Sequence, residues 1–259
     1  MDTRRTKQVA YGTLYLIIAG GVVAGIYFSF LYHPASCFDN IQNQGEAGID
    51  CGGPCAKVCV PQSVGISKNG GISLFNIFPE RSSLPIRYTA LAQVLNTNSG
   101  FASPDFGFRF DFYGASSTLI KSVSGHSFIY GGEVKYLIAP NEELQAPVDH
   151  VALVIEGPTW VSADELGLKP KLTARLTGTV DASTTVTVNG ELVNGDVSAF
   201  SNILVVAIFK DGTNTPIGAT QTIVDQIGPN TTQPFSVVYP VRPGLDPSRT
   251  ELYAYALRQ

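Results

Sequence analysis

The sequence predicts an all-β protein in which two tandem immunoglobulin-like β-sandwiches follow one transmembrane helix and a small disulfide module. Three observations lead to this fold class. No Asp, Glu, Lys or Arg occurs between Lys7 and Asp39, and all four cysteines lie in residues 37–59. The rest of the 259-residue chain is rich in Val, Thr, Ser, Gly and Pro. It alternates apolar and polar side chains with the two-residue period of β-strands.

The N-terminal segment has the features of a membrane anchor. Residues 9–32 are uncharged and would span roughly 36 Å as a helix, which exceeds the ~30 Å hydrocarbon core of a bilayer. Arg4, Arg5 and Lys7 precede the span, so the positive-inside rule places a basic tail, residues 1–8, in the cytoplasm and everything after the span outside. A cleaved signal peptide has a shorter apolar run that ends in small residues, whereas this run ends in bulky aromatics. We therefore expect an uncleaved, single-pass signal anchor in the cell membrane.

Two glycines inside the predicted span suggest how such helices could pair. Gly21 and Gly25 have the small-x-x-x-small spacing that lets two membrane helices approach closely. Glycine is also common in membrane helices that do not pair. The sequence therefore leaves a homo-oligomer open, with these two glycines as the candidate contact.

An even number of cysteines in a short, Gly-rich segment outside the cytoplasm predicts two disulfides, which would stabilise a segment that has almost no hydrophobic core. The cysteines are Cys37, Cys51, Cys55 and Cys59. Four cysteines allow three pairings, and the sequence does not choose among them. Zinc binding by four thiolates is the alternative, but the paired C-x-x-C spacing of zinc ribbons is missing.

The stretch CFDNIQNQGEAGIDCGGPC (37–55) resembles a short cysteine module of secreted and surface proteins, approximately C-x-D-G-x-x-N-x-x-E-x-x-x-D-C-G-G-x-C. The residues in register with it are Asp39, Asn43, Glu46, Asp50, Cys51, Gly52, Gly53 and Cys55. Asn40 replaces the usual Gly, and Asn also tolerates positive φ. The resemblance implies an extracellular location and is nearly silent about activity.

Four side chains of this module supply the hard oxygen donors that calcium prefers. They are Asp39, Asn43, Glu46 and Asp50. The alternative, which we favour, is that they cap turns and hydrogen-bond the backbone of a small disulfide knot. The sequence thus predicts no resident cofactor and leaves calcium as the candidate metal.

The β-rich part of the chain divides into two halves, residues 62–160 and 171–259. In the first half, four phenylalanines alternate with polar or small residues, so they would lie on one face of a strand and point into a core. They are Phe106, Phe108, Phe110 and Phe112. In the second half, residues 204–209 form a continuous apolar strand.

The two halves also align with each other, at an offset of about 96–101 residues. The matched segments are 90–98 with 187–195, 108–120 with 205–217, 127–138 with 225–238, and 151–157 with 252–258. Asn96 and Asn194 each end a predicted strand. About a hundred residues with six or seven strands is the size of an immunoglobulin-like sandwich.

Each half resembles an FxLYD-type domain, a seven-stranded sandwich family related to the LEA and WHy proteins. The resemblance depends on a strand that ends in Asn, a long apolar strand that ends in an aromatic residue and a turn, and a Gly-Pro-Asn turn. In the second half these features are Asn194, 203–211 and 227–230. The first half departs from the pattern at 112–114, where Phe-Tyr-Gly replaces the expected ending. The resemblance implies an envelope-associated interaction module without catalytic residues.

Composition and motifs argue against several classes of function. Acidic residues outnumber basic ones 21 to 17 and no basic run follows Lys7, which argues against a nucleic acid partner. No metal-binding His pair or nucleophile elbow occurs. The histidines, which are isolated from one another, are His33, His126 and His150. Asn230 begins an N-x-T sequon and is the glycosylation candidate. We expect no enzyme activity.

These features together predict a membrane-anchored interaction or adaptor protein that presents tandem sandwiches, outside the cytoplasm, to a partner protein or envelope polymer. The candidate contact loops are Thr97–Asp105 and Gly195–Ser201. One alternative is a self-assembling structural subunit of a cell-surface layer, filament or secretion apparatus. The other alternative is a carbohydrate-binding envelope protein.

Overall fold

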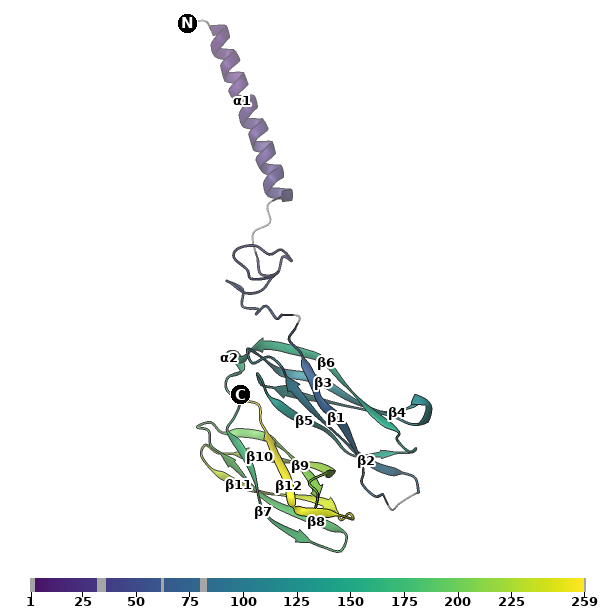
Figure 1. The fold of residues 1–259 in the computed structure, drawn as a ribbon. Helices are drawn as coiled ribbons and strands as arrows, with labels where there is room; N and C mark the ends of the chain where they lie inside the picture. The colour runs from purple at the N-terminus through teal and green to yellow at the C-terminus, as the bar shows by residue number, and fades with distance from the viewer. Residues whose placement is uncertain (1–2, 32–35, 62, 80–82, 259) are drawn as a thin grey trace. The chain divides into compact units, whose positions relative to one another are not determined.

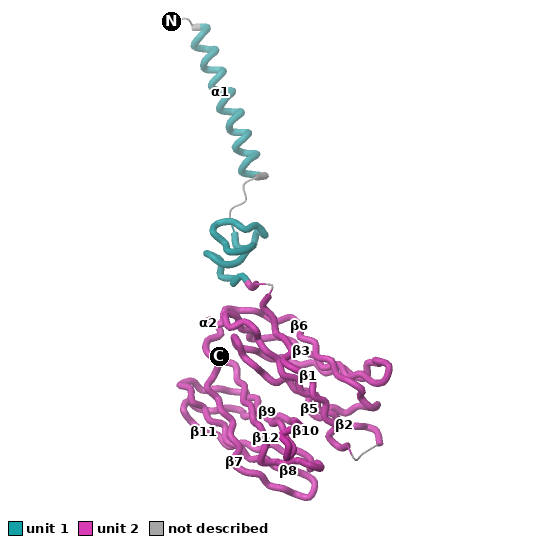
Figure 2. The backbone as a smooth tube through the Cα atoms, in the orientation of Figure 1, with its two compact units in different colours: residues 1–59 teal, residues 60–259 magenta. Residues whose placement is uncertain are grey.

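The computed structural model describes residues 3–31, 36–61, 63–79 and 83–258. The chain divides into two compact units, Met1–Cys59 and Val60–Gln259 (Figure 2). The first unit holds an apolar helix and two disulfides, and the second holds the twelve described strands, arranged in four sheets (Figure 1). The predicted all-β fold class, with its N-terminal helix and disulfide module, is confirmed.

The first unit begins with α1 (Thr3–Ile26), which continues as the π-helical turn η1 (Tyr27–Leu31). The stretch Arg4–Ser29 is long and apolar enough to cross a membrane, and none of the most apolar part of it is buried by the rest of the chain. Apolar residues surround this helix instead of forming one stripe, a pattern that suits lipid on all sides. The predicted span, 9–32, falls on this helix up to Leu31, and Tyr32 lies outside the described residues.

The second unit begins with six antiparallel strands in two sheets, ordered β1-β2-β5 and β4-β3-β6. Their bounds are β1 Ile66–Asn76, β2 Ile86–Asn96, β3 Phe101–Tyr113, β4 Leu119–Ile129, β5 Val134–Leu144 and β6 His150–Ser162. A single 3-10 turn, η2 (Ala115–Ser117), lies between β3 and β4. We call this part the first sandwich.

The second sandwich repeats this topology after the short helix α2 (Ala163–Leu166). Its sheets have the orders β7-β8-β11 and β10-β9-β12. The bounds are β7 Leu172–Asp181, β8 Thr185–Asn194, β9 Phe200–Asp211, β10 Pro216–Ile227, β11 Thr232–Pro240 and β12 Leu245–Tyr255. Each sandwich therefore has six described strands, where the family resemblance implied seven.

The repeat extends to the irregularities of the strands. In the β3–β4 hairpin the register shifts after Phe112, and in the β9–β10 hairpin it shifts after Phe209. A β-bulge re-aims the residues that follow it, so a shared bulge identifies equivalent positions. Phe112 is thus the counterpart of Phe209, at an offset inside the range that the sequence alignment predicts.

The four sheets of the second unit form a stack of layers, in the order β4-β3-β6, β1-β2-β5, β10-β9-β12 and β7-β8-β11 (Figure 1). Apolar clusters fill the interior of each sandwich, and a further cluster joins the two sandwiches. We call this joining cluster the junction. It consists of Phe75, Leu91, Ile138, Val206, Ile208, Ala219 and Tyr255, with Phe128, Tyr136, Leu204 and Tyr253 at its margin.

The stack explains two different sequence patterns in equivalent strands. The four alternating phenylalanines of β3 all pack in the core of the first sandwich, as predicted, with Phe108 only partly buried. The opposite face of β3 is polar. In β9, by contrast, Val205 and its alternate neighbours face the core of the second sandwich, while Val206 and Ile208 face the junction. Because both faces of β9 are covered, its sequence is apolar throughout.

Candidate functional site

The cysteine module contains two disulfides, Cys37–Cys55 and Cys51–Cys59. The Cα atoms are 5.6 Å apart in the first and 5.0 Å apart in the second. This settles the pairing that the sequence left open. Oxidation of all four cysteines removes the thiolates that zinc would need. Glu46 Oε1 lies 3.0 Å from Cys55 Sγ, but a disulfide sulfur offers no charge to a metal.

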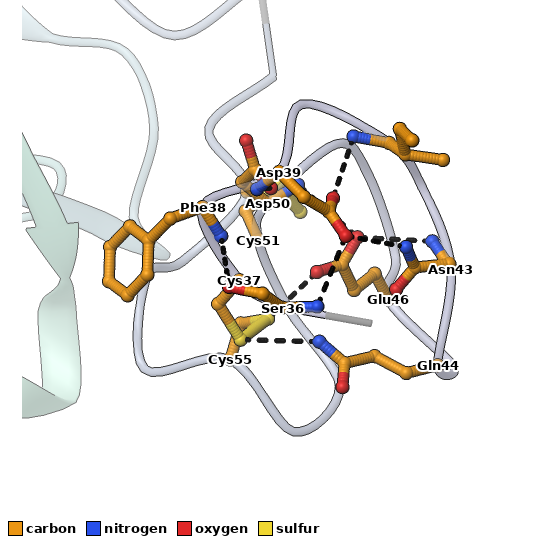
Figure 3. Close-up of a disulfide and its surroundings, with 12 residues drawn as sticks. Ser36, Cys37, Phe38, Asp39, Asn43, Gln44, Glu46, Asp50, Cys51 and Cys55 are labelled. Atoms are coloured by element: carbon orange, nitrogen blue, oxygen red, sulfur yellow. Dashed lines mark hydrogen bonds between the residues drawn. A yellow bond between two sulfur atoms is a disulfide. The ribbon is translucent and has the colours of Figure 1, made fainter. Parts of the chain in front are cut away.

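The acidic side chains of the module accept hydrogen bonds from nearby backbone (Figure 3). Asp39 accepts from the backbone N–H of Ser36 at 3.1 Å, from that of Ile41 at 2.9 Å and from Asn43 Nδ2 at 2.9 Å. The hydrogen bond from Asn43 is the main reason that the pKa of Asp39 lies below its usual value. Asp39 therefore stabilises the first loop of the module as a carboxylate.

The carboxylates of Asp50 and Glu46 have the same role. Asp50 accepts from the N–H groups of Asp39 and Asn40, at 3.0 Å to the nearest oxygen in each case, and Asn40 has the positive φ that the module pattern requires. Glu46 accepts from the N–H groups of Asn43 and Asp50. All three carboxylates thus satisfy loop backbone, which is the structural role that we set against calcium binding. Calcium binding by these residues stays a prediction.

Two other predicted sites lie on exposed parts of the chain. Nothing lies within 4 Å of a Cβ built on Gly21 or Gly25 of α1, so a second helix has room to approach there. Asn230 lies on the exposed turn between β10 and β11, with a positive φ. Helix pairing and glycosylation both stay predictions.

The described histidines form isolated surface pairs. His126 Nδ1 lies 3.1 Å from Asp105 Oδ1, and both side chains are exposed. His150 Nδ1 lies 2.9 Å from Asp149 Oδ2, and its ring stacks on Tyr113. His33 lies outside the described residues. Within the described ranges, the hydrogen bonds of these two histidines reach no serine hydroxyl that they could activate.

Two buried asparagines close equivalent turns in the two sandwiches. Asn96 Nδ2 donates to the carbonyl of Phe101 at 2.7 Å and to that of Tyr130 at 2.9 Å. Asn194 Nδ2 donates to the carbonyls of Ser198 and Gly228, at 2.8 Å each. Each side chain thereby links the end of its strand to the segment at, or just before, the start of the next strand and to the turn before the fifth strand of the repeat.

These ties shorten the contact loops that the sequence predicted. β3 begins at Phe101 and β9 at Phe200, so the C-terminal parts of Thr97–Asp105 and Gly195–Ser201 belong to strands, and those loop boundaries are wrong. The buried amide groups of Asn96 and Asn194 need hydrogen-bond acceptors, and they find them in carbonyls only four or five residues further along the chain. The connection to the next strand is therefore short. The loops are tight turns.

A buried lysine lies at one end of the junction. Lys135 is 1% exposed and its Nζ donates to the carbonyl of Phe128 at 2.8 Å. The Phe128 ring centroid is 3.2 Å from this nitrogen and the Tyr255 centroid is 4.9 Å away. Burial lowers the pKa of Lys135 to about 7. Its acidic neighbour Glu133 is instead paired with Lys169 Nζ, at 2.8 Å.

The C-terminal end of the chain adds polar contacts across the same region. Tyr130 of the first sandwich donates through its hydroxyl to the carbonyl of Ala256 at 3.3 Å and accepts from the N–H of Arg258 at 2.8 Å. The Arg258 guanidinium pairs with Asp196 and holds the pKa of that carboxyl below its usual value. The last described residues therefore bind both sandwiches together. Sequence reasoning missed these residues. The only sequence signal for them was Lys135 itself, a charged residue inside an otherwise apolar segment, 134–139.

Comparisons with known proteins add little to this geometry. No protein-family model matches the chain, and no curated protein matches it. Among solved structures, the chain is similar to the crystal structure of red sea bream transglutaminase, with 10% sequence identity and a TM-score of 0.23. The similarity covers 73% of this chain and 31% of that chain. At so low a TM-score this likeness carries no argument about fold or activity.

Proposed function

We propose that this chain is a membrane-anchored interaction or adaptor protein that presents two rigidly joined sandwiches outside the cytoplasm and carries out no catalysis. The apolar helix with Arg4, Arg5 and Lys7 on its N-terminal side supports this orientation. The two disulfides support it independently, because disulfides persist in oxidising compartments.

The junction is the observation that carries the proposal. Interfaces between domains of one chain are ordinarily more polar than permanent protein interfaces, and they allow relative motion. Here Leu91, Ile138, Val206 and Ile208 are all buried between the two sandwiches. Apolar contact of this kind holds the outer sheets at a fixed separation, which suits a protein that positions binding surfaces.

Ion pairs or side-chain hydrogen bonds lie on both outer faces of the stack, and this favours reversible docking over self-assembly by further stacking. On the β4-β3-β6 sheet, Arg109 pairs with Asp111 and with Glu156. On the β7-β8-β11 sheet, Ser236 Oγ donates to Asn189 Oδ1 at 2.8 Å. A third sandwich that stacked on either face would have to desolvate these groups.

The topology is tested with protease and a thiol-reactive polyethylene glycol maleimide, added to intact cells that express the full chain. We expect external protease to remove the β-rich part. We also expect the maleimide to label the cysteines only after reduction. A β-rich part that stays protected, together with cysteines that react without reduction, would contradict the proposal.

The docking role is tested by cross-linking the full chain in native membranes and identifying what it captures. Photoreactive residues at Glu156 and Asn189, one on each outer face, report whether those faces contact another protein. We expect a partner at one or more surfaces of the β-rich part. Reaction only with water, at every surface position tested, would refute the adaptor role.

A further inference from the structure

The most exposed large apolar side chain of the described residues is that of Phe38, which is 90% exposed. Phe38 lies in the disulfide module, directly after Cys37, and its ring points out of the module on the side away from Asn43 and Gln44 (Figure 3). Single exposed apolar residues are common on protein surfaces, so exposure alone assigns no role to this ring. Its place in the chain and the loop that holds it are more informative.

Phe38 closely follows the apolar helix. It is seven residues after Leu31, the last residue of η1, and a chain of that length extends at most about 25 Å. With α1 across the bilayer, Phe38 therefore stays within this distance of the point where the helix leaves the lipid. The membrane surface is available to the ring without the entropic cost of bringing two separate molecules together.

The loop that carries Phe38 is fixed within the module. On one side of the ring, Cys37 is joined to Cys55 by a disulfide. On the other side, the N–H of Asp39 donates to Asp50 Oδ1 at 3.0 Å. Because both chain neighbours of Phe38 are held by distant residues, little further backbone entropy is lost when the ring enters another medium.

Side chains of the module already satisfy the backbone donors around this ring. The N–H of Ser36 donates to Asp39 at 3.1 Å, and that of Phe38 donates to Ser36 Oγ at 3.3 Å. The N–H groups of Asn40 and Ile41 donate to carboxylates of the module. An unsatisfied peptide group is costly to move out of water, so these hydrogen bonds lower the cost of placing the loop against lipid.

We infer that Phe38 inserts into the outer interface of the membrane that α1 spans and thereby seats the disulfide module on the bilayer. Elements that lie on a membrane bury apolar side chains at the boundary between headgroups and acyl chains. Full burial of a Phe side chain favours the buried state roughly tenfold to a hundredfold. This inference rests on the proposed function, which places the module just outside the membrane, and it adds a lipid surface as the partner of that module.

The test uses a single tryptophan as a reporter in the full chain. The protein has one tryptophan, Trp160, so Phe38→Trp in a Trp160→Phe background reports on position 38 alone. Ile41→Trp in the same background is the matched control, because Ile41 is also apolar and is 52% exposed in the same module. Both proteins are reconstituted into phosphatidylcholine vesicles, with or without lipids that are brominated on the acyl chains close to the headgroup.

We expect the tryptophan at position 38 to emit at a shorter wavelength than the one at position 41 and to lose more of its intensity to the brominated lipid. Equal losses at the two positions overturn seating by Phe38. Emission typical of water at position 38, unchanged by brominated lipid, overturns any docking of the ring. A shorter wavelength without loss of intensity shows that protein covers the ring, and this overturns lipid as the occupant.

A second measurement leaves Trp160 in place. Benzoylphenylalanine replaces Phe38 in the otherwise native chain, and light should then add the mass of a lipid to the peptide that contains residue 38. A cross-link to a second copy of this chain or to another protein, with none to lipid, overturns the inference.

Alkaline carbonate extraction of the same vesicles separates this inference from the proposed function. Release of the full chain shows that α1 does not span the bilayer, and this overturns both proposals. A chain that resists extraction while position 38 stays exposed to water overturns the seat alone and leaves the adaptor role intact.

Discussion

The two sandwiches have the same strand order and a shared bulge. Their equivalent strands β3 and β9 nevertheless differ on the face that points away from the sandwich core, which is polar in β3 and apolar in β9. In β3 the residues that face away from the core include Arg109 and Asp111, which are joined in an ion pair with 2.9 Å between Arg109 Nε and Asp111 Oδ1. The equivalent residues of β9 are Val206 and Ile208, which are buried in the junction. The fold is therefore common to both repeats. Whether a sheet lies at the end of the stack or in the junction depends on whether the residues that face away from its sandwich core are polar or apolar.

The same contrast holds between the sheets β1-β2-β5 and β7-β8-β11. Leu91 of β2 and Ile138 of β5 are buried in the junction, whereas Asn189 of β8 and Ser236 of β11 hydrogen-bond to each other on an exposed face. One face of each sandwich is apolar and the other carries ion pairs or side-chain hydrogen bonds, which accounts for a stack of two sandwiches. Four predictions test this comparison.

The largest effect is expected from Ile208→Asp. A carboxylate buried in the junction without a partner should destabilise the protein by about 3–5 kcal/mol and should make the two sandwiches unfold separately. Differential scanning calorimetry of the full chain in detergent measures both effects. The reciprocal control, Asp111→Ile, removes a carboxylate that is 5% exposed and accepts hydrogen bonds from Arg109 and Ser122, so it should cost about 1–3 kcal/mol. It should leave the two sandwiches unfolding together and should promote self-association through the new apolar patch. Separate unfolding of the two sandwiches in both variants would contradict the assignment of Ile208 alone to the junction.

Lys135→Met should stabilise the protein by about 1–4 kcal/mol, because it replaces a buried cation with an apolar side chain of similar volume. The pKa of Lys135 is about 7 in the folded protein and about 10.4 in an unfolded chain. The unfolded chain therefore binds more protons between these values, so the free energy of unfolding of the native protein rises as pH increases from about 7 to about 9.5.

Urea denaturation across this pH range measures the slope, which should be smaller in Lys135→Met. Lys121→Met is the matched control, since Lys121 is only partly buried and is paired with Glu142 at 2.6 Å. A control variant that flattens the slope as much as Lys135→Met would assign the pH dependence elsewhere.

The buried asparagines test the similarity of the sandwiches instead of their difference. Asn96→Ala and Asn194→Ala each leave two carbonyls without a donor, which should cost about 1–3 kcal/mol in each case. Thermal unfolding of the two single variants should give equal losses. A sandwich that tolerates its substitution without loss would show that the shared hydrogen bonds are not equally important.

The smallest effect is expected in the β9–β10 turn. Asp211 accepts from the N–H groups of Thr213 and Thr215, at 2.8 and 2.9 Å, whereas the β3–β4 turn has Gly114 nearby and no such carboxylate. Hydrogen bonds from Thr213 are the main reason that the pKa of Asp211 lies below its usual value. Asp211→Ala should lower the free energy of unfolding slightly at neutral pH, because the turn loses these hydrogen bonds.

The pH dependence of this loss checks its cause. A lowered pKa stabilises the folded state above the unfolded pKa, and that stability is lost as pH falls through the folded pKa. The difference between native protein and Asp211→Ala, measured by urea denaturation, should therefore shrink in acid. A difference that is constant with pH would indicate lost packing.

Features that depend on neighbouring residues could be predicted from the sequence. The uncharged run before Asp39 gives the helix, four clustered cysteines give two disulfides, and the alternation from Phe106 to Phe112 gives the buried face of β3. Each of these patterns lies within one segment, where spacing alone determines which side chains share a face.

Features that depend on distant segments could not be predicted. The pairing of Cys37 with Cys55 depends on how the loops of the module fold back. The continuous apolar strand 204–209 signals that both of its faces are covered, but not that Leu91 and Ile138 cover one of them. The burial of Lys135 requires Phe128 and Tyr255 to come together from different strands.

The apolar face of β1-β2-β5 also has a consequence for synthesis. The ribosome completes the first sandwich, which ends at Ser162, before β9 and β12 exist. At 5–20 residues per second, the remaining chain takes roughly 5–20 s to emerge. During that interval Leu91 and Ile138 are exposed to water or to another nascent chain. The nascent chain is therefore most prone to aggregate after the first sandwich has folded and before the second has.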